Sequence, residues 1–175
     1  RRAIKTFILA VMMIPSQDTA LGFYDLMKTF GLLDNYIPLI VPTIAAPVVY
    51  FFMLQYMQGS LPLEIVEAAR IDGSNEFKTF NAIVLPIMKP AIAVQAIFAF
   101  VSNWNNYFTP NLIIRSQKLF TLPIVIAKLR AADFTSFDNG KIYMAMVLSI
   151  LPVVVVYLIL SRYIIQGVAV GSVKG

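Results

Sequence analysis

The side chains that could do chemistry are few and lie mostly in one segment. The 175-residue chain contains no cysteine and no histidine, which excludes disulfides, thiolate nucleophiles, Cys/His zinc sites and imidazole acid–base catalysis. The densest group of charges falls within residues 59–81 and comprises Glu64, Glu67, Arg70, Asp72, Glu76 and Lys78. No pair of acids and no nucleophile beside a base stands out elsewhere, so the pattern does not indicate a catalytic centre.

A phosphate-binding loop is also missing from the sequence. The one Gly-Lys pair, Gly140-Lys141, has Thr135 where the leading glycine of that motif would fall. The net charge of +5 is small and its basic residues are scattered, whereas nucleic-acid binding needs a basic face or stripe. The sequence therefore predicts neither nucleotide hydrolysis by this chain nor a nucleic-acid partner.

The elements that position the polar segment are apolar. Hydrophobic residues make up 59% of the chain and charged residues 13%, which indicates that lipid covers much of the surface. Four apolar stretches run over about residues 3–15, 36–57, 80–101 and 142–160. A membrane-spanning helix needs about 20 apolar residues, so the first stretch is short. We predict an all-α, polytopic transmembrane helix bundle.

Other local patterns complete this outline. Residues 20–31 carry apolar side chains at helical spacing and predict a short interfacial helix. Prolines occur inside the predicted spans, where they kink helices and shape cavities: Pro38, Pro42, Pro47, Pro86, Pro90 and Pro152. The chain begins at Arg1 without a methionine, and we expect it to be an interior fragment of a longer protein.

The polar segment 59–81 predicts a helix–turn–helix between two spans. Ser60 is the expected N-cap, and Pro62 suits the first turn. Gly73 is the expected helix end, after which Ser74 can cap a second short helix. Small residues on this hairpin leave room for another protein to approach closely.

The same segment carries a longer pattern. Glu67-Ala68-Ala69 is followed after three residues by Gly73, and after nine more by Ile83, any residue, and Leu85-Pro86. This arrangement resembles the EAA motif of the permease subunits of type I, binding-protein-dependent ABC importers. The resemblance implies a type I permease fold with this loop in the cytoplasm, in line with a slight excess of Lys and Arg on that side.

The resemblance also implies roles for the motif residues. In that family the loop is a coupling helix that docks into a cleft of the ATP-hydrolysing subunit. Carried over, the residues that couple to the ATPase are Glu67, Ala68, Ala69, Arg70, Asp72 and Gly73, with Ile83, Leu85 and Pro86 seating the following span. Two alternatives stay open: Glu67 pairs with Arg70 within the helix, or the hairpin merely ties two spans together.

Further stretches resemble the carbohydrate-uptake branch of these permeases, which includes the smaller permease subunit of maltose transporters. They are residues 67–73, 103–105, 119–123 and 167–175, with Asn105 where many members have Asp. The implied function is uptake of a mono- or oligosaccharide through a multi-pass permease in a prokaryotic plasma membrane. The implied partners are a second permease subunit, a cytoplasmic ATPase dimer that holds ATP and Mg, and an extracellular solute-binding protein. No cofactor is expected in this chain, and the first two spans of the family would precede it.

Two groups near the expected outer surface are candidates for substrate or partner contact. Asn103, Trp104, Asn106 and Tyr107 combine amides and aromatic rings, which suit sugars; an interfacial aromatic belt is the alternative. In the family the loop that matches residues 129–138 reaches toward the binding protein, which makes Asp133, Phe134 and Phe137 candidate contacts.

Other functions remain open at this point. The same machine could import a polyol or a glycerol-phosphate-like solute. A channel subunit would need a polar lining along a span, and an intramembrane enzyme would need acids or a nucleophile there. The predicted spans offer little beyond Gln55 and Gln95 and contain no acidic residue, so they favour neither.

Overall fold

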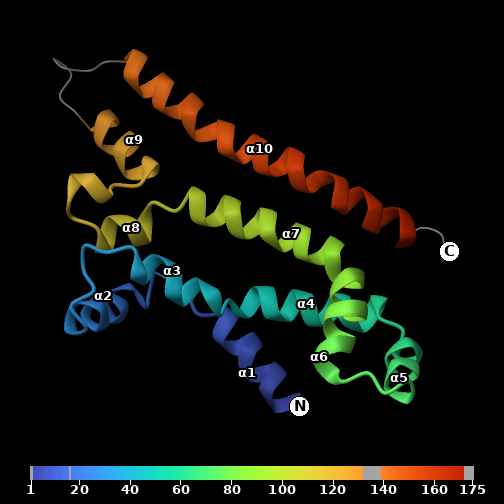
Figure 1. Ribbon diagram of the computed structural model, residues 1–175. Helices are drawn as coiled ribbons and strands as arrows, with labels where there is room; N and C mark the ends of the chain where they lie inside the picture. Colours follow the sequence, from blue (N-terminus) through green and yellow to red (C-terminus); the bar gives the residue numbers. More distant parts are fainter. Residues whose placement is uncertain (1, 16, 132–138, 172–175) are drawn as a thin grey trace. The chain divides into compact units, whose positions relative to one another are not determined.

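In the computed structural model every regular element in the described residues (2–15, 17–131 and 139–171) is a helix (Figure 1). This agrees with the predicted all-α class. The elements in chain order are α1 Arg2–Met12, α2 Ala20–Thr29, α3 Ile37–Ile44, α4 Pro47–Ser60, α5 Leu63–Ile71, α6 Glu76–Thr79, the π-helix η1 Phe80–Val84, α7 Leu85–Trp104, α8 Phe108–Ile113, the 3-10 helix η2 Gln117–Leu119, α9 Leu122–Arg130 and α10 Asn139–Gly171.

Three described stretches are long and apolar enough to cross a membrane. They are Ile37–Ser60, Glu76–Trp104 and Asn139–Arg162, and they overlap the second, third and fourth stretches expected from the sequence. In the first and last of them only 6% of the most apolar window is buried within the protein, so lipid or other membrane helices must cover the rest. Helix α1 has 11 residues, and a span over residues 3–15 stays a prediction.

Prolines decide where these apolar stretches depart from regular α-helix. Helix α3 ends at Ile44, Ala45 has φ −107° and ψ 59°, and α4 begins at Pro47. A proline disfavours the α conformation in the residue before it, here Ala46, which favours a helix break at this point. Pro86, within the stretch Glu76–Trp104, has no N–H to donate. There the chain forms the π-helix η1, in which the N–H of Leu85 bonds to the carbonyl of Phe80.

The chain divides into two compact units, which we describe separately. The first unit comprises Arg1–Pro47 and Phe100–Val155. Its core is formed by Met27 of α2 with Ile113 and Ile114 at the end of α8, and it is extended by half-buried Phe23, Tyr24, Leu32, Leu33, Leu39, Leu119 and Phe120. The predicted helix at residues 20–31 is confirmed, but Phe30 follows its end and is 63% exposed.

A carboxylate holds two distant loops of the first unit together. Asp34 lies in the left-handed region (φ 58°), and its Oδ1 accepts the N–H groups of Arg115 and Ser116 at 2.9 and 2.8 Å. Its Oδ2 accepts the Ser116 hydroxyl. Arg115 in turn donates to the Tyr24 hydroxyl at 2.7 Å. We call this group the Asp34 clamp, because it joins the loop after α2 to the loop after α8.

The second unit comprises Val48–Ala99 and Val156–Gly175. Its core contains Val84, Met88 and Ala91, at the junction of η1 and α7. Half-buried side chains of α4 and of the segment that follows pack against this core: Phe52, Met53, Tyr56, Met57, Leu61 and Val66. Val66 belongs to α5, so the polar hairpin is anchored to the apolar helices through its own inner face.

The Asp34 clamp should weaken as the pH falls. Hydrogen bonds from the hydroxyl and N–H of Ser116 and from the N–H of Arg115 hold the pKa of Asp34 below its usual value of 3.8, since they favour the ionised carboxylate. Because the folded-state pKa is the lower one, the clamp's contribution is complete above the unfolded-state pKa and is lost as the pH falls through the folded value. Hydrogen-exchange protection of the Arg115 and Ser116 amides, followed from about pH 7 to about pH 3, should fall in that window.

Asp34→Asn is the matched variant for this titration. It should lower the protection of both amides at neutral pH and remove its pH dependence, because the amide does not ionise in this range. Native protection that stays constant down to the lowest pH, or that matches the variant at neutral pH, contradicts the role assigned to the carboxylate.

Candidate functional site

The polar segment 59–81 folds into the predicted hairpin, which consists of α5, a turn and α6. Its caps differ from those expected. Helix α4 continues through Ser60, so Pro62 with ψ 121° is the N-cap of α5. The second cap is Asn75, whose Oδ1 accepts the Lys78 N–H at 2.8 Å. Ser74 instead accepts a hydrogen bond from the Thr79 hydroxyl at 3.0 Å.

The turn at Gly73 has the geometry of a Schellman motif. Gly73 has φ +77°, its N–H donates to the carbonyl of Arg70 at 3.0 Å, and the Ser74 N–H donates to the carbonyl of Ala69 at 2.9 Å. This pair of bonds satisfies two carbonyls at the helix end, and a glycine adopts the required conformation without strain. The predicted helix end at Gly73 is confirmed.

An ion pair closes the hairpin from outside. Arg70 Nε and Nη2 lie 2.9 and 2.8 Å from Glu76 Oε1, so the expected alternative of a pair with Glu67 is wrong. The reason is the turn, which brings the start of α6 back alongside the end of α5. Both partners are more than half exposed, and such a pair contributes only about 0–1 kcal/mol.

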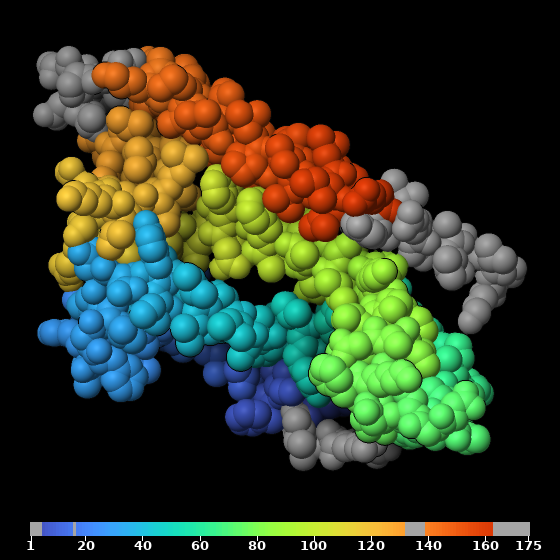
Figure 2. All heavy atoms as spheres, in the orientation of Figure 1, coloured from blue at the N-terminus to red at the C-terminus, as the bar shows by residue number. Residues whose placement is uncertain are grey.

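The hairpin presents a mixed surface to its surroundings. Glu67, Ala68 and Asp72 are exposed, whereas Ala69 is 8% exposed and faces the protein. Ile71 is 87% exposed at the tip. In Figure 2 the green atoms at the lower right, which include α5 and α6, are not covered by other parts of the chain. Covering this isoleucine with another molecule would bury its apolar surface, which is favourable by about 1.5–3 kcal/mol.

The three motif residues at the start of the following helix have unequal positions. Ile83 lies in η1 and is half-buried, whereas Leu85 and Pro86 are exposed. The core contact is made by the neighbouring Val84 instead. The seating role expected for Ile83, Leu85 and Pro86 stays a prediction.

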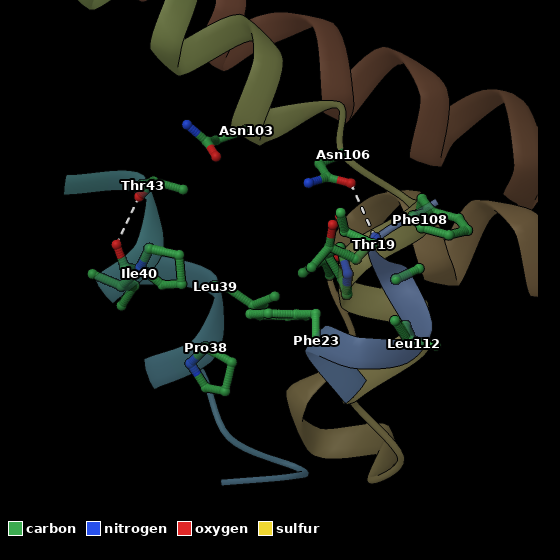
Figure 3. A pocket seen from close by; sticks show the side chains of 15 residues that line it. Thr19, Phe23, Pro38, Leu39, Ile40, Thr43, Asn103, Asn106, Phe108 and Leu112 are labelled. Carbon is green, nitrogen blue, oxygen red and sulfur yellow. Dashed lines mark hydrogen bonds between the residues drawn. The ribbon is translucent and has the colours of Figure 1, made fainter. Parts of the chain in front are cut away.

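The amide and aromatic residues at the end of α7 and in the loop that follows it divide between two cavities of the first unit. Asn103 and Asn106 line a cavity of about 550 Å³, which we call the amide cavity (Figure 3). Trp104 and Tyr107 line a smaller one of about 260 Å³. Trp104 Nε1 donates to the carbonyl of Ser149 at 2.9 Å, and its ring stacks on Phe100. The indole N–H of Trp104 is therefore already bonded within the protein.

The amide cavity is walled by α2, α3, α8 and the ends of α7 and α9. Its lining residues are Thr19, Ala20, Phe23, Pro38, Leu39, Ile40, Pro42, Thr43, Asn103, Asn106, Phe108, Thr109, Pro110, Leu112 and Thr121. None of them is charged. Its volume falls within the range of about 300–1,000 Å³ typical of small-molecule sites.

Asp133, Phe134 and Phe137 lie outside the described residues, and their proposed contact stays a prediction. The loop expected at 129–138 begins later than predicted, because α9 continues to Arg130. In the part of the chain that the structure describes, no group of three acidic side chains is placed to hold a metal ion.

Two features of the first unit were not found from the sequence. The Asp34 clamp joins residues more than 80 positions apart, and no local pattern marks such a pair. The contribution of Thr19 and Thr121 to the amide cavity likewise depends on tertiary packing. The Thr-Leu-Pro sequence at 121–123 does give a local signal, since threonine before a proline is typical of a helix start.

Comparisons with known proteins agree on one family. The profile of the family described as binding-protein-dependent transport system inner membrane component matches residues 1–170. The arabinooligosaccharides transport system permease protein of Halalkalibacterium halodurans is 39% identical over 96% of this chain and 59% of its own. The lactose transport system permease protein of Rhizobium radiobacter is 31% identical over 99% and 62%, respectively.

The fold is also found among solved structures. A crystal structure of a bacterial ABC transporter involved in the import of the acidic polysaccharide alginate superimposes with a TM-score of 0.77 and 24% identity. The match covers 93% of this chain and 61% of that one. The chain thus spans about three fifths of the length of the proteins it resembles.

Gly73→Ala should loosen the hairpin turn. A Cβ at this position meets nothing within 4 Å, so the effect comes from the left-handed backbone, which costs other residues about 1–2 kcal/mol. The exchange protection of the Ser74 amide should fall about five- to thirty-fold. Gly59→Ala is the control, because Gly59 is helical and has equal space around it. Equal effects of the two substitutions contradict the assigned role of φ at Gly73.

Proposed function

Because the chain belongs to the family of binding-protein-dependent transport system inner membrane components, we propose that it works in an ATP-driven sugar importer. It supplies part of a transmembrane permease subunit and couples ATP hydrolysis in a partner to uptake of a mono- or oligosaccharide. The names of its relatives, which are permeases for arabinooligosaccharides and lactose, support a sugar as the substrate. Its own activity is transport, and ATP and Mg belong to the partner ATPase.

The observation that carries this proposal is the exposed apolar tip of the hairpin. Ile71 is 87% exposed and lies between two of the stretches long enough to span a membrane. A side chain in a loop between two spans lies outside the hydrocarbon layer, where a partner protein can supply an apolar cover. The cover we propose is a cleft of the cytoplasmic ATPase.

The surface around Ile71 suits insertion into a cleft. Ala68 is exposed and small, so it allows close approach of the helix backbone. Glu67 and Asp72 add exposed carboxylates on the same hairpin, which can pair with basic groups of the partner. Each of these residues also occupies a position of the EAA motif or lies beside one.

The internal bonds of the hairpin make it a lever. The ion pair between Arg70 and Glu76 connects α5 to α6 directly, while the bonds of the Gly73 turn and the Asn75 cap fix the end of α5 and the start of α6. Helix α6 continues without a break through η1 into α7, since the residues that join them stay in the helical region. Displacement of α5 by a partner is therefore passed to the start of a membrane helix.

The transport cycle we propose is alternating access. ATP binding closes the two partner ATPases, the hairpins of the two permease subunits move with them, and the helices open a central cavity toward the solute-binding protein. Hydrolysis and release reset the helices. Each ATPase state must contact the hairpin differently, because a ligand shifts a conformational equilibrium only through its differential affinity for the two conformations.

Ile71→Ser in the full-length protein should detach the ATPase. The side chain is exposed, so the fold loses no packing, but the dock loses the burial of one isoleucine, worth about 1.5–3 kcal/mol. The affinity for the ATPase should fall about ten- to hundred-fold. The measurement is affinity purification from native membranes in mild detergent, with mass spectrometry of the co-purifying chains and ATP-dependent uptake of labelled arabinotriose and lactose.

Leu21→Ser is the matched control for this test. Leu21 is 77% exposed on α2 of the other unit, and its substitution should leave the ATPase bound. Recovery of a second permease and an ATPase with the native protein, and loss of the ATPase with Ile71→Ser alone, supports the proposal. A homo-oligomer purified without any ATPase contradicts the proposal and favours the alternative hypothesis of a channel subunit.

A further inference from the structure

Lys89 is a charged residue well inside a stretch that is apolar enough to cross a membrane. It lies on α7, within Glu76–Trp104, and its side chain is exposed. A charge at such a position is costly unless an anion or water meets it, so it indicates a functional contact. In the part of the chain that the structure describes, the recorded ion pair joins Arg70 to Glu76 and does not involve Lys89.

The geometry of the helix directs Lys89 toward the hairpin. In an α-helix the Cα–Cβ bond tilts toward the N-terminus, and α7 begins directly after the hairpin and η1 (Figure 1). Because Glu76–Thr79 forms α6 of the hairpin, Lys89 lies in the half of the remaining stretch that is nearer to it. Long lysine side chains at such positions extend along the helix to the headgroup region. We therefore expect its ammonium group to approach the level of the lipid phosphates.

An apolar groove lies on the same side of α7. It has a volume of about 240 Å³ and belongs to the second unit. Lys89 comes four residues after Leu85 and three before Ile92, and this spacing places the three residues on one side of the helix. We call the cavity the α4–α7 groove, and its lining residues are Tyr50, Met53, Leu54, Met57, Phe80, Val84, Leu85, Met88 and Ile92.

The length and lining of the α4–α7 groove suit a hydrocarbon chain. The lining extends from Tyr50 to Met57 on α4 and from Leu85 to Ile92 on α7, which is about 10 Å along each helix axis. One leaflet of the hydrocarbon layer is about 15 Å thick, so the groove matches about two thirds of it. Three of the nine lining residues are methionines, whose unbranched side chains adapt to an irregular partner.

The floor of the groove is supported by the protein, whereas its edges are open. Val84 and Met88 are 8% and 5% exposed and form part of the core of the second unit. Tyr50 and Phe80 are each 50% exposed. A floor that is formed before the ligand arrives reduces the entropic cost of binding, and open edges allow a lipid to enter from the side.

The lining does not suit a water-filled passage beside Lys89. Among the nine lining residues, the Tyr50 hydroxyl is the one strong hydrogen-bonding group, and a passage for ions or hydrophilic solutes needs polar walls. An acyl chain needs no polar partner, and a lipid phosphate supplies the negative charge that the lysine lacks. The two parts of this surface therefore match the two parts of a phospholipid.

We propose that the α4–α7 groove holds one acyl chain of an anionic phospholipid and that Lys89 binds the phosphate of the same lipid. A zwitterionic lipid presents a similar phosphate together with its own cation, which competes with the lysine, so the site prefers the anionic headgroup. The inference depends on the membrane location of the family and not on the proposed uptake of a sugar.

The test places a fluorophore beside the groove in the full-length protein, purified with the chains that accompany it. The chain has no cysteine of its own, and any elsewhere in the complex are replaced. Ala96→Cys puts the label at an exposed position one turn beyond Ile92. The complex is reconstituted in vesicles of dioleoyl phosphatidylcholine, and increasing fractions of that lipid are exchanged for phosphatidylglycerol or phosphatidylcholine with brominated acyl chains.

The brominated chains quench the fluorophore on contact, so the two titrations report which lipid occupies the groove. Quenching should show an about fivefold preference for phosphatidylglycerol, as expected for one lysine near the headgroups. Ile150→Cys is the matched control, because Ile150 is 58% exposed in another apolar stretch, and both lipids should quench its label equally. The same preference at both positions indicates a general enrichment around the protein and overturns the proposal. A label at Ala96→Cys that neither lipid quenches also overturns it, and indicates that another membrane helix covers the groove.

Substitutions of Lys89 in the Ala96→Cys background test the role of the charge. Lys89→Gln should reduce the preference from about fivefold to about one, whereas Lys89→Arg should retain it. Lys28→Gln, at an exposed lysine of α2, should leave it unchanged. A preference that survives Lys89→Gln, or that Lys89→Arg also abolishes, refutes phosphate binding by this lysine. None of these results depends on whether the complex transports a sugar.

Discussion

Backbone N–H and C=O groups inside a bilayer must bond within the protein, because no water reaches them. The three apolar stretches meet this requirement with helices, and prolines set the points at which the pattern has to change. The break before Pro47 and the π-helix before Pro86 are both consequences of a missing N–H or of the ring's steric demand. Most charged groups therefore lie outside the apolar stretches or near their ends, as in the hairpin and the Asp34 clamp, and Lys89 is an exception.

The hairpin could be predicted from sequence because the forces that form it are local. Gly73 is the residue that tolerates the left-handed turn, and the amino-acid spacing around it gives the helices on either side. The predicted N-caps of the two hairpin helices, Ser60 and Ser74, were wrong by one or two residues, and the reasons are also local. Ser60 is absorbed into α4, and the Schellman turn uses Ser74, so Pro62 and Asn75 take the cap positions.

The first unit was far less predictable because its determinants are long-range. Asp34 meets Ser116 and Trp104 meets Ser149 through folding that no periodic pattern records. The sequence analysis grouped Asn103, Trp104, Asn106 and Tyr107 as one surface, but the structure assigns them to two cavities. Because α7 ends at Trp104, Asn106 and Tyr107 lie in the loop that follows, and helical spacing does not determine where their side chains lie.

Helix α7 connects the two candidate sites along the chain. It begins directly after the hairpin and η1, and its last turn carries Asn103. In an importer, this helix has to carry movement of the hairpin toward the cavity or bend on the way. Pro90 withholds one N–H within α7, and η1 has wider hydrogen-bond spacing at its start. A flexible hairpin would absorb a displacement of α5 before it reached η1 and Pro90. The Schellman bonds and the Arg70–Glu76 pair make the turn stiff enough to pass the displacement on to α7.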